Sequence, residues 1–286
     1  MRIVLLGSGG QLGYEFERFL KGKEEIYPFP HSKLDVLDFE NLKEVFKKIK
    51  PHIVINCAAY TKVDEAEENK DLALKVNAIG ARNVSFASFK IGAKVVYFST
   101  DYVFDGNKNS SYTEFDKPNP ISIYGESKYL GEKLTERFNP NHLILRISWL
   151  YGIKGSNFVK TIIKISKEKK FLRIVNDQIG TPTYTLDVVK QAYLLLKRDY
   201  VGLFHSSNNG ETTWFEFAKK INLLLNLGSN ITPIETKDYP TKAKRPKYSV
   251  LENYLLKLDN LDIMRKWEVA LEDFLSKYKK ELLNEQ

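Results

Sequence analysis

Residues 2–13 read RIVLLGSGGQLG, a short apolar run that passes directly into a glycine-rich turn. The run Arg2–Leu6 predicts a buried β-strand, and the amphipathic stretch Gln11–Lys21 predicts a helix directly after the turn. Glycine permits a tight turn between the two, because it adopts backbone conformations that other residues avoid. A strand, a glycine turn and a helix in this order predict the first unit of an α/β fold.

The first half of the chain continues this alternation. Further apolar runs predict strands at residues 26–29, 52–56, 94–99 and 142–148. Helical patterns between them cover residues 42–49, 71–91 and 122–137. Continuous apolar strands separated by helices are typical of a parallel sheet that is covered on both faces. We therefore expect an α/β fold with a Rossmann-type doubly wound parallel sheet.

The glycine turn also predicts a ligand. Gly7, Gly10 and Gly13 lie between the first strand and the first helix, a setting in which a turn binds a pyrophosphate. The backbone approaches phosphate closely at glycine, and the N–H groups at a helix start attract negative charge. The spacing differs from the usual G-x-G-x-x-G pattern, because Leu12 stands where the third glycine would be. We expect a dinucleotide at this turn.

The residues after the second predicted strand bear on the choice of dinucleotide. The acid that binds the adenosine ribose of NAD is not found there, and His31, Ser32 and Lys33 occupy the region. Their hydroxyl and cationic groups are compatible with a 2′-phosphate, so we expect either NADPH or NADH as the cofactor. Asp35 follows beside the expected adenosine end, and Asp38 is expected to cap the next helix.

The second half of the chain has a looser pattern. Helical stretches at residues 158–166, 185–196 and 213–225 are followed by a region that Pro233, Pro240 and Pro246 interrupt. We expect residues 1–150 to form the dinucleotide-binding Rossmann domain. We expect residues 151–286 to form mainly a smaller substrate-binding lobe that is interleaved with the end of the sheet.

The composition is that of an ordinary globular protein, with 43% hydrophobic and 28% charged residues. No apolar run approaches the roughly 18 residues of a membrane span, so we expect no membrane partner and a cytoplasmic location. The single cysteine, Cys57, excludes an internal disulfide. With only four histidines in addition, we expect no metal site.

The net charge of +8 is concentrated in the second half, where residues 151–286 carry 23 Lys and Arg against 16 Asp and Glu. Such an excess favours an anionic ligand. Arg245 lies in the densest basic run, Lys242–Lys247, and a guanidinium group suits a diphosphate because it binds two oxygens at once. A solvated basic loop is the alternative. No nucleic-acid-binding motif is present, so we expect no nucleic acid partner.

Tyr124 and Lys128 carry the strongest catalytic signal. They are four residues apart in a predicted helix, so their side chains lie on one face, one turn apart. A cation beside a phenol lowers the pKa of the phenol. Such a tyrosine can give its proton to a carbonyl oxygen while a hydride reaches the carbon. Thr100 and Asp101, at the end of a predicted buried strand, complete the constellation.

Together these motifs resemble the extended short-chain dehydrogenase/reductase superfamily over essentially the whole chain. The shared motifs are Gly7-x-x-Gly10-x-x-Gly13, Asn56-Cys57-Ala58-Ala59, Ser99-Thr100 and Tyr124-x-x-x-Lys128. Within the superfamily, the runs AYTKVD (59–64), STDYVFDG (99–106) and DQIGTPT (177–183) are similar to the dTDP-4-dehydrorhamnose reductase family. The resemblance implies reduction of the 4-keto group of dTDP-4-dehydro-L-rhamnose to dTDP-L-rhamnose by NADPH or NADH.

The resemblance also implies residue roles. Tyr124 would be the general acid, Lys128 would tune it and bind the nicotinamide ribose, and Thr100 would hydrogen-bond the ketone. The implied cofactor-binding residues are Gly7, Gly10, Gln11, Leu12, Asp35, Val36, Ala58, Ala59, Tyr60, Tyr124 and Lys128. The implied substrate-binding residues are Thr100, Asp101, Trp149, Asn157, Gln178, Thr181 and Arg245. For Trp149, an aromatic wedge between the lobes is the alternative.

Two further residues match positions of the superfamily. Asn77 is expected to brace the sheet near the site. Glu15 matches a glutamate that is associated with magnesium at the subunit interface of some relatives. Because no other ligand matches, we expect Glu15 to be an exposed helix carboxylate and predict no metal. A homodimer is the expected state of a cytosolic enzyme of this size.

Other functions stay open at this point. Sugar-nucleotide 4,6-dehydratases carry Thr-Asp-Glu where this chain has Thr100-Asp101-Tyr102, so the acid that they need is absent. Another nucleotide-sugar reductase or an epimerase would share the Tyr124 and Lys128 pair. Some proteins with this fold are non-catalytic, dinucleotide-binding regulatory subunits of methionine adenosyltransferase. The intact pair favours an enzyme over such a subunit.

Overall fold

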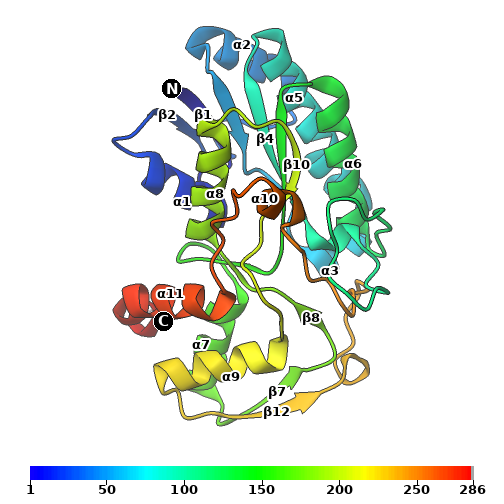
Figure 1. Ribbon diagram of the computed structural model, residues 1–286, viewed down its shortest axis with the longest axis vertical. Helices are drawn as coiled ribbons and strands as arrows, with labels where there is room; N and C mark the ends of the chain where they lie inside the picture. The colour runs from blue at the N-terminus through cyan, green and yellow to red at the C-terminus, as the bar shows by residue number, and fades with distance from the viewer. Residues whose placement is uncertain (285–286) are drawn as a thin grey trace.

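The computed structural model describes residues 1–284, and its central sheet confirms the doubly wound parallel fold. Six parallel strands lie in the order β10-β5-β4-β3-β1-β2 (Figure 1). Their bounds are β1 Arg2–Leu6, β2 Glu25–Phe29, β3 Ile53–Asn56, β4 Lys94–Thr100, β5 His142–Ile147 and β10 Gly202–His205. Because β1 pairs with both β2 and β3, the strand order reverses beside β1. In such folds a ligand binds in the crevice at the carboxyl ends of the strands, where the order reverses.

Helices cover both faces of the sheet because its strands are apolar on both sides. Along β1, Ile3 and Leu5 belong to one core, while Val4 and Leu6 belong to another. The first core includes α1 (Gln11–Leu20) and α8 (Thr185–Lys197). The second includes α2 (Phe39–Ile49) and α5 (Gly80–Lys90), and α6 (Ile123–Phe138) packs beside α5. The predicted cap at Asp38 is confirmed, since its side chain accepts a hydrogen bond from the backbone N–H of Asn41.

The helix that the sequence predicts over residues 71–91 is divided. It follows α3 (Val63–Glu68) and consists of α4 (Lys70–Leu74), a π-helical turn at Lys75–Ile79 and α5. π-Helical turns are rare and occur frequently at functional sites. This one carries Asn77, whose contacts are described below.

A third core, separate from the two that cover the sheet, holds the lower part of the molecule together (Figure 1). It is built mainly by α7 (Phe158–Glu168), α9 (Trp214–Leu225) and α11 (Trp267–Asn284). Strand β7 (Phe171–Val175) pairs with β12 (Asn230–Ile234) beside it. The short strands are β6 Leu150–Tyr151 with β9 Thr183–Tyr184, and β8 Ile179–Gly180 with β11 Thr212–Thr213. The remaining elements are α10 at Tyr254–Leu258 and single 3₁₀ turns at Asp101–Val103 and Thr236–Asp238.

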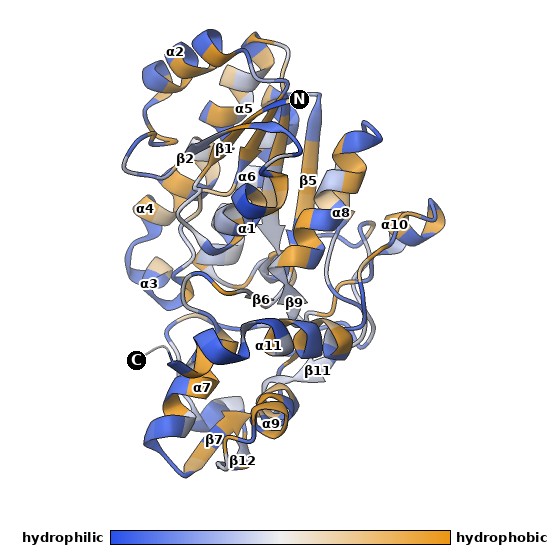
Figure 2. Cartoon of the chain, turned by 90° about the vertical axis from the view of Figure 1, so that its left-hand side faces the viewer, coloured by the Kyte–Doolittle hydropathy of each residue, from blue (hydrophilic) through white to orange (hydrophobic). Residues whose placement is uncertain are grey.

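The second half of the chain contributes to both parts. Strand β10 lies at one edge of the sheet, and α8 packs on α1. A division of the chain at residue 150 stays a prediction. Figure 2 shows hydrophobic residues along the strands of the sheet, such as β5, and hydrophilic residues on outer turns of α2 and α11. No helix within residues 1–284 is long and apolar enough to span a bilayer.

A buried ion pair fixes α6 to the sheet. The guanidinium of Arg146 on β5 donates from Nε and Nη2 to the two carboxylate oxygens of Glu132 on α6, each at 2.8 Å. The two side chains are almost completely buried. The ring of Phe104 lies 5.1 Å from the guanidinium carbon. Burial beside Arg146 lowers the pKa of His205 to about 3, so this imidazole is neutral at physiological pH.

Substituting one partner of this pair tests its role in the fold. Glu132→Gln leaves Arg146 without its counter-ion, and we expect the free energy of unfolding to fall by about 3–5 kcal/mol. Glu136→Gln is the matched control, because Glu136 lies one turn further along α6 in an exposed pair with Lys133. Its expected effect is below about 1 kcal/mol. Urea unfolding measures both, and an equally small effect of the two substitutions would contradict the role given to Glu132.

Candidate active site

The glycine turn packs against the loop that follows β3. Gly7 has a φ of +71°, and a Cβ there would lie 2.7 Å from the backbone nitrogen of Ala58. A Cβ on Gly13 would lie 2.2 Å from the carbonyl oxygen of Gly7. Both positions therefore require glycine, because real Cβ atoms do not approach other atoms so closely. The close packing brings the start of α1 next to the end of β3.

The N-terminus of α1 faces a cavity of about 410 Å³. Gly10 caps the helix without a side-chain hydrogen bond, and Gly10, Gln11 and Leu12 line the cavity. The first N–H groups of a helix have no partner within the helix, and they carry partial positive charge. A turn without side-chain bulk at the start of a helix fits the pyrophosphate of a dinucleotide.

The same cavity collects all three residues that the sequence predicts for catalysis and several that it predicts for cofactor and substrate binding. Its other walls come from the loop after β3, the end of β4, the first two turns of α6 and the segment after β5. The predicted site residues that line it are Gly10, Gln11, Leu12, Ala58, Ala59, Thr100, Asp101, Tyr124, Lys128 and Trp149. Ser99 also lines it, and the buried Oγ of Ser99 has no hydrogen-bond partner among residues 1–284.

Tyr124 lies in the first turn of α6, and Ser122 is the N-cap of this helix. The Ser122 side chain accepts a hydrogen bond from the backbone N–H of Gly125. The Tyr124 ring packs edge-on against Tyr102, with ring centroids 5.9 Å apart. Burial raises the pKa of Tyr124 to about 12, and the Thr100 side chain opposes this shift. The sequence predicts a lowered pKa for Tyr124, because it considers only the charge of Lys128. That prediction is wrong, because burial has the larger effect and raises the pKa. The phenol is thus protonated at neutral pH.

Lys128 lies one turn further along α6 and is 3% exposed. Its Nζ is 4.2 Å from the centroid of the Tyr97 ring. Burial lowers the pKa of Lys128 to about 7, and the charge of Glu132 opposes this shift. The ammonium group therefore titrates near neutral pH in the free protein.

Asp101 follows the last residue of β4 and is buried. Its Oδ1 accepts a hydrogen bond from the Thr100 hydroxyl at 3.1 Å. Its Oδ2 has no hydrogen-bond partner among residues 1–284. Burial raises the pKa of Asp101 to about 6, and the side chains of Ser249 and Thr100 oppose this shift. A buried carboxylate oxygen without a partner is a site at which a ligand hydroxyl can donate.

Trp149 separates this cavity from a second one. It has a φ of 42°, and its ring stacks on Trp214 with centroids 3.4 Å apart. A Cβ on Gly180 would lie 2.4 Å from the Trp149 ring. Trp149 lines the first cavity, and Trp214 lines a second cavity of about 590 Å³. Trp214 was not predicted as a site residue, because nothing in the local sequence connects it with Trp149.

Two of the predicted substrate residues line the second cavity, Gln178 and Arg245. The Gln178 amide donates to the Thr236 hydroxyl at 3.0 Å. The guanidinium of Arg245 pairs with Asp64 on α3, and Nη2 and Oδ2 are 2.7 Å apart. Much of the remaining wall is apolar and includes Phe158 and Trp214. The residues predicted for catalysis thus line the smaller cavity, whereas Gln178, Arg245 and many apolar groups line the larger.

Several predicted cofactor residues lie outside both cavities. Gly7 forms the turn described above. The Asp35 carboxylate accepts a hydrogen bond from the backbone N–H of Leu37, and Val36 is buried against Gly80. The backbone N–H of Tyr60 donates to the Asn77 side chain at 2.8 Å. Their contacts with a cofactor stay predictions.

Two predicted substrate residues, Asn157 and Thr181, also lie outside these two cavities. The Asn157 amide caps α7 and donates to the Gln11 side chain at 2.8 Å. The buried Thr181 hydroxyl donates to the Gly210 carbonyl at 2.7 Å. Their contacts with substrate stay predictions, and the hydrogen bonds described here give both side chains partners within the protein.

Asn77 braces the site from behind. Its side-chain amide exchanges hydrogen bonds with the backbone of Tyr60 and donates to the Ser127 hydroxyl on α6 at 2.9 Å. The π-helical turn thus joins the loop after β3 to the helix that carries Tyr124 and Lys128. The contacts agree with the bracing role that the sequence analysis predicts for Asn77.

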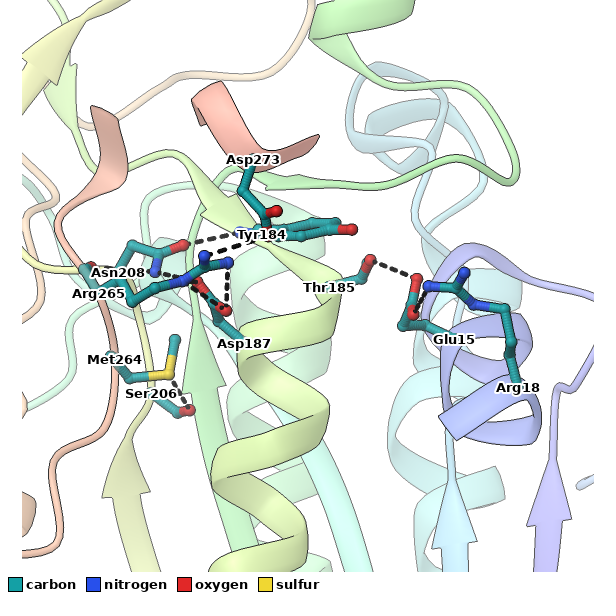
Figure 3. Close-up of polar contacts among 10 residues, drawn as sticks. All are labelled: Glu15, Arg18, Tyr184, Thr185, Asp187, Ser206, Asn208, Met264, Arg265 and Asp273. Carbon is teal, nitrogen blue, oxygen red and sulfur yellow. Dashed lines mark hydrogen bonds and ion pairs between the residues drawn. The ribbon is translucent and has the colours of Figure 1, made fainter. Parts of the chain in front are cut away.

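Glu15 is not the exposed carboxylate that the sequence analysis predicts. It is 1% exposed, because α8 packs over this part of α1. It pairs with Arg18 and accepts a hydrogen bond from the Thr185 hydroxyl at 3.3 Å (Figure 3). In the part of the chain that the structure describes, no three His, Cys, Asp or Glu side chains form a group that could hold a metal ion.

The sequence model described as the RmlD substrate binding domain matches residues 1–280. The dTDP-4-dehydrorhamnose reductase of Escherichia coli K12 is 35% identical over 96% of this chain and 97% of its own. The chain belongs to the dTDP-4-dehydrorhamnose reductase family. The spore coat polysaccharide biosynthesis protein SpsK of Bacillus subtilis is 39% identical over 96% of each chain.

Solved structures of the family agree with this membership. The Bacillus anthracis dTDP-4-dehydrorhamnose reductase in complex with NADP superimposes with a TM-score of 0.95 at 45% identity. The match covers 96% of this chain and 99% of that one. The resemblance that the sequence motifs carry is thereby confirmed, and a reductase is supported over a regulatory subunit.

The stack of Trp149 on Trp214 can be tested directly. Gly180→Ala places a Cβ where the Trp149 ring lies, so we expect the indole to leave the stack. Two indoles stacked in contact give an exciton-coupled signal in far-ultraviolet circular dichroism, and this signal should be lost. Trp267→Phe is the control, because Trp267 packs on Phe217. A coupled signal that survives Gly180→Ala, or that is lost in the Trp267 variant, would contradict the arrangement.

Proposed function

We propose that the protein reduces the 4-keto group of dTDP-4-dehydro-L-rhamnose and yields dTDP-L-rhamnose, with NADPH or NADH as the reductant. One observation carries the proposal. A single cavity joins the open N-terminus of α1 to Tyr124, Lys128 and Thr100. Membership of the family and the matching order of motifs support the identity of the substrate.

The residues of the cavity fit a nicotinamide dinucleotide. Gly10, Gln11 and Leu12, which line the cavity at the start of α1, would hold its pyrophosphate, and Gly7 would shape the turn on which they lie. Ala58, Ala59 and Tyr60 would contact its middle, and Asp35 and Val36 its adenosine end. When bound, the reduced nicotinamide supplies a hydride. The NADP complex of the Bacillus anthracis relative supports this assignment.

Tyr124 supplies the proton that the reduction needs. A phenol with a pKa of about 12 remains protonated at neutral pH, and it is a stronger acid than the alcohol that forms when the alkoxide takes its proton. Thr100 hydrogen-bonds the same oxygen and stabilises its developing charge. The ammonium of Lys128, one turn away, stabilises the phenolate that remains and binds the nicotinamide ribose. The ketone thus gains one hydride at carbon and one proton at oxygen.

The substrate would extend from one cavity to the other. Asp101 Oδ2, which has no partner among residues 1–284, accepts a hydrogen bond from a sugar hydroxyl. Trp149 packs against the sugar at the boundary between the cavities. Gln178 and Arg245 bind the nucleotide end in the larger cavity. Asn157 and Thr181 complete the proposed substrate residues.

The proposal also covers the state of the protein in the cell. We infer a homodimer in the cytoplasm. Two-fold dimers are the commonest oligomers of globular enzymes, and this expectation supports the inference. Sedimentation equilibrium of the purified protein distinguishes a dimer from a monomer.

A coupled assay tests the proposed reaction. dTDP-4-dehydro-L-rhamnose is generated in place from dTDP-glucose by a dehydratase and an epimerase, and oxidation of NADPH or NADH is followed at 340 nm. Oxidation that requires the epimerase and yields dTDP-L-rhamnose supports the proposal. Oxidation without the epimerase would identify a different 4-keto sugar as the substrate. No oxidation by folded protein that binds the dinucleotide would contradict a reductase.

Replacement of the proton donor gives a specific prediction. Tyr124→Phe should lower kcat by about 10²–10⁴-fold while the dinucleotide still binds, because only the phenolic proton is lost. Tyr102→Phe is the matched control, since Tyr102 packs against Tyr124 but does not line the cavity. It should keep kcat within a few-fold of the wild type. Near-wild-type turnover of the Tyr124 variant would contradict its role.

The pKa of Lys128 predicts the pH profile. The side chain is charged below about pH 7 and neutral above it, so kcat/KM, which reports the free enzyme, should fall as the pH rises through 7. In Lys128→Arg the cation persists, and this fall should move to higher pH even though the maximal rate is lower. Asp101, with a pKa of about 6, titrates on the acid side in both proteins. If kcat/KM of Lys128→Arg falls at the same pH as that of the wild type, a group other than Lys128 causes the fall.

A further inference from the structure

The segment Lys242–Lys247, which carries Arg245, is held against helix α3 by two ion pairs. Arg245 pairs with Asp64 and Lys242 pairs with Glu68, and both acids belong to α3. Figure 1 shows this segment, in orange, beside α3. Gly106 packs against it as well, since a Cβ there would lie 2.7 Å from the backbone nitrogen of Lys247. The segment is therefore fixed at several points, although only Arg245 and residues before Lys242 reach the larger cavity.

The hydrogen bonds of Arg245 define the orientation of its guanidinium group. Nη1 and Nη2 donate to Oδ1 and Oδ2 of Asp64 at 3.1 and 2.7 Å. Nη1 also donates to the carbonyl of Ala243 at 3.2 Å. The backbone N–H of Ala243 donates to the same Asp64 carboxylate at 3.0 Å. One carboxylate thus fixes both the end of the side chain and the backbone two residues before it.

This orientation leaves one edge of the guanidinium available. A guanidinium has five N–H groups, and the bonds to Asp64 and Ala243 use three of them. The N–H on Nε and the second N–H on Nη2 have no acceptor among residues 1–284. These two donors lie side by side in one plane, and such a pair matches two oxygens of a phosphate group.

We propose that Asp64 is a positioning residue that holds Arg245 with its Nε and Nη2 edge toward a diphosphate in the larger cavity. The inference rests on the proposed function, because the diphosphate is that of the nucleotide sugar. Asp64 acts through Arg245, since Arg245 lines the cavity and Asp64 does not. As an anion, Asp64 also repels a diphosphate, so its removal would tighten binding if it had no positioning role.

The neighbouring ion pair provides a matched control. Glu68 lies one turn from Asp64 on the same helix and pairs with Lys242 of the same segment. The Lys242 side chain is 60% exposed and does not line the cavity. Loss of this pair therefore changes the attachment of the segment without changing Arg245.

The experiment measures binding of dTDP by isothermal titration calorimetry, with KM and kcat for the keto sugar alongside. We expect Asp64→Asn to weaken dTDP binding roughly tenfold and to raise KM similarly, with kcat within twofold, because the guanidinium of Arg245 loses its fixed orientation. Glu68→Gln should bind dTDP within twofold of the wild type. Arg245→Gln should bind at least as weakly as Asp64→Asn. Adding Asp64→Asn to Arg245→Gln should cause no further loss, because the two act as one unit.

Three results would overturn the inference: unchanged or tighter dTDP binding by Asp64→Asn, an equal loss in Glu68→Gln, or independent losses in the double variant. If Asp64→Asn does not fold, the binding of dTDP is measured with Arg245→Lys. A lysine can keep the pair with Asp64 but lacks the second edge, so it should lose about tenfold in affinity, and full affinity would be contradictory. If the wild type binds dTDP and Asp64→Asn weakens this binding, but the wild type reduces no keto sugar, the proposed function is wrong and the role of Asp64 stands. Wild-type protein that binds no dTDP would overturn both.

Discussion

The close contact between Gly7 and the loop after β3 is the constraint on which the site depends. The backbone of Gly7 lies so near Ala58 that no side chain fits between them, and a side chain at Gly13 would likewise clash with the carbonyl of Gly7. The first turn of α1 is thereby held at the point where the strand order reverses. The positive end of the helix and the ends of β3 and β4 consequently face one cavity. A larger residue at either glycine would separate the two halves of this arrangement.

The proposed catalytic side chains depend on buried polar contacts that lie outside the cavity. Asn77 joins the loop after β3 to α6, and Glu132 joins α6 to β5 through Arg146. These bonds fix the helix that carries Tyr124 and Lys128. The same burial raises the pKa of Tyr124 and lowers that of Lys128, so a neutral acid lies one turn from a cation that titrates near pH 7. Rigid positioning and low polarity thus have a common origin in the packing of α6.

Features that depend on short stretches of sequence were predictable. The strands, the glycine turn and the spacing of Tyr124 and Lys128 are local patterns, and the structure contains each of them. The direction of the Tyr124 pKa shift was not predictable, because it depends on how deeply α6 is buried. The burial of Glu15 depends on α8, which lies about 170 residues later in the chain. The pairs of Trp149 with Trp214 and of Asp64 with Arg245 likewise join segments that no local pattern connects.

The most direct measurement follows the hydride itself. The protein is supplied with dTDP-4-dehydro-L-rhamnose and with NADPH that carries deuterium at both C4 positions of the nicotinamide, and the product is analysed by NMR. We expect dTDP-L-rhamnose with one deuterium at C4 of the sugar, and a transfer that is about 10²–10⁴-fold slower in Tyr124→Phe. Deuterium at another carbon, or dinucleotide binding without any transfer to the sugar, would contradict the proposed reaction.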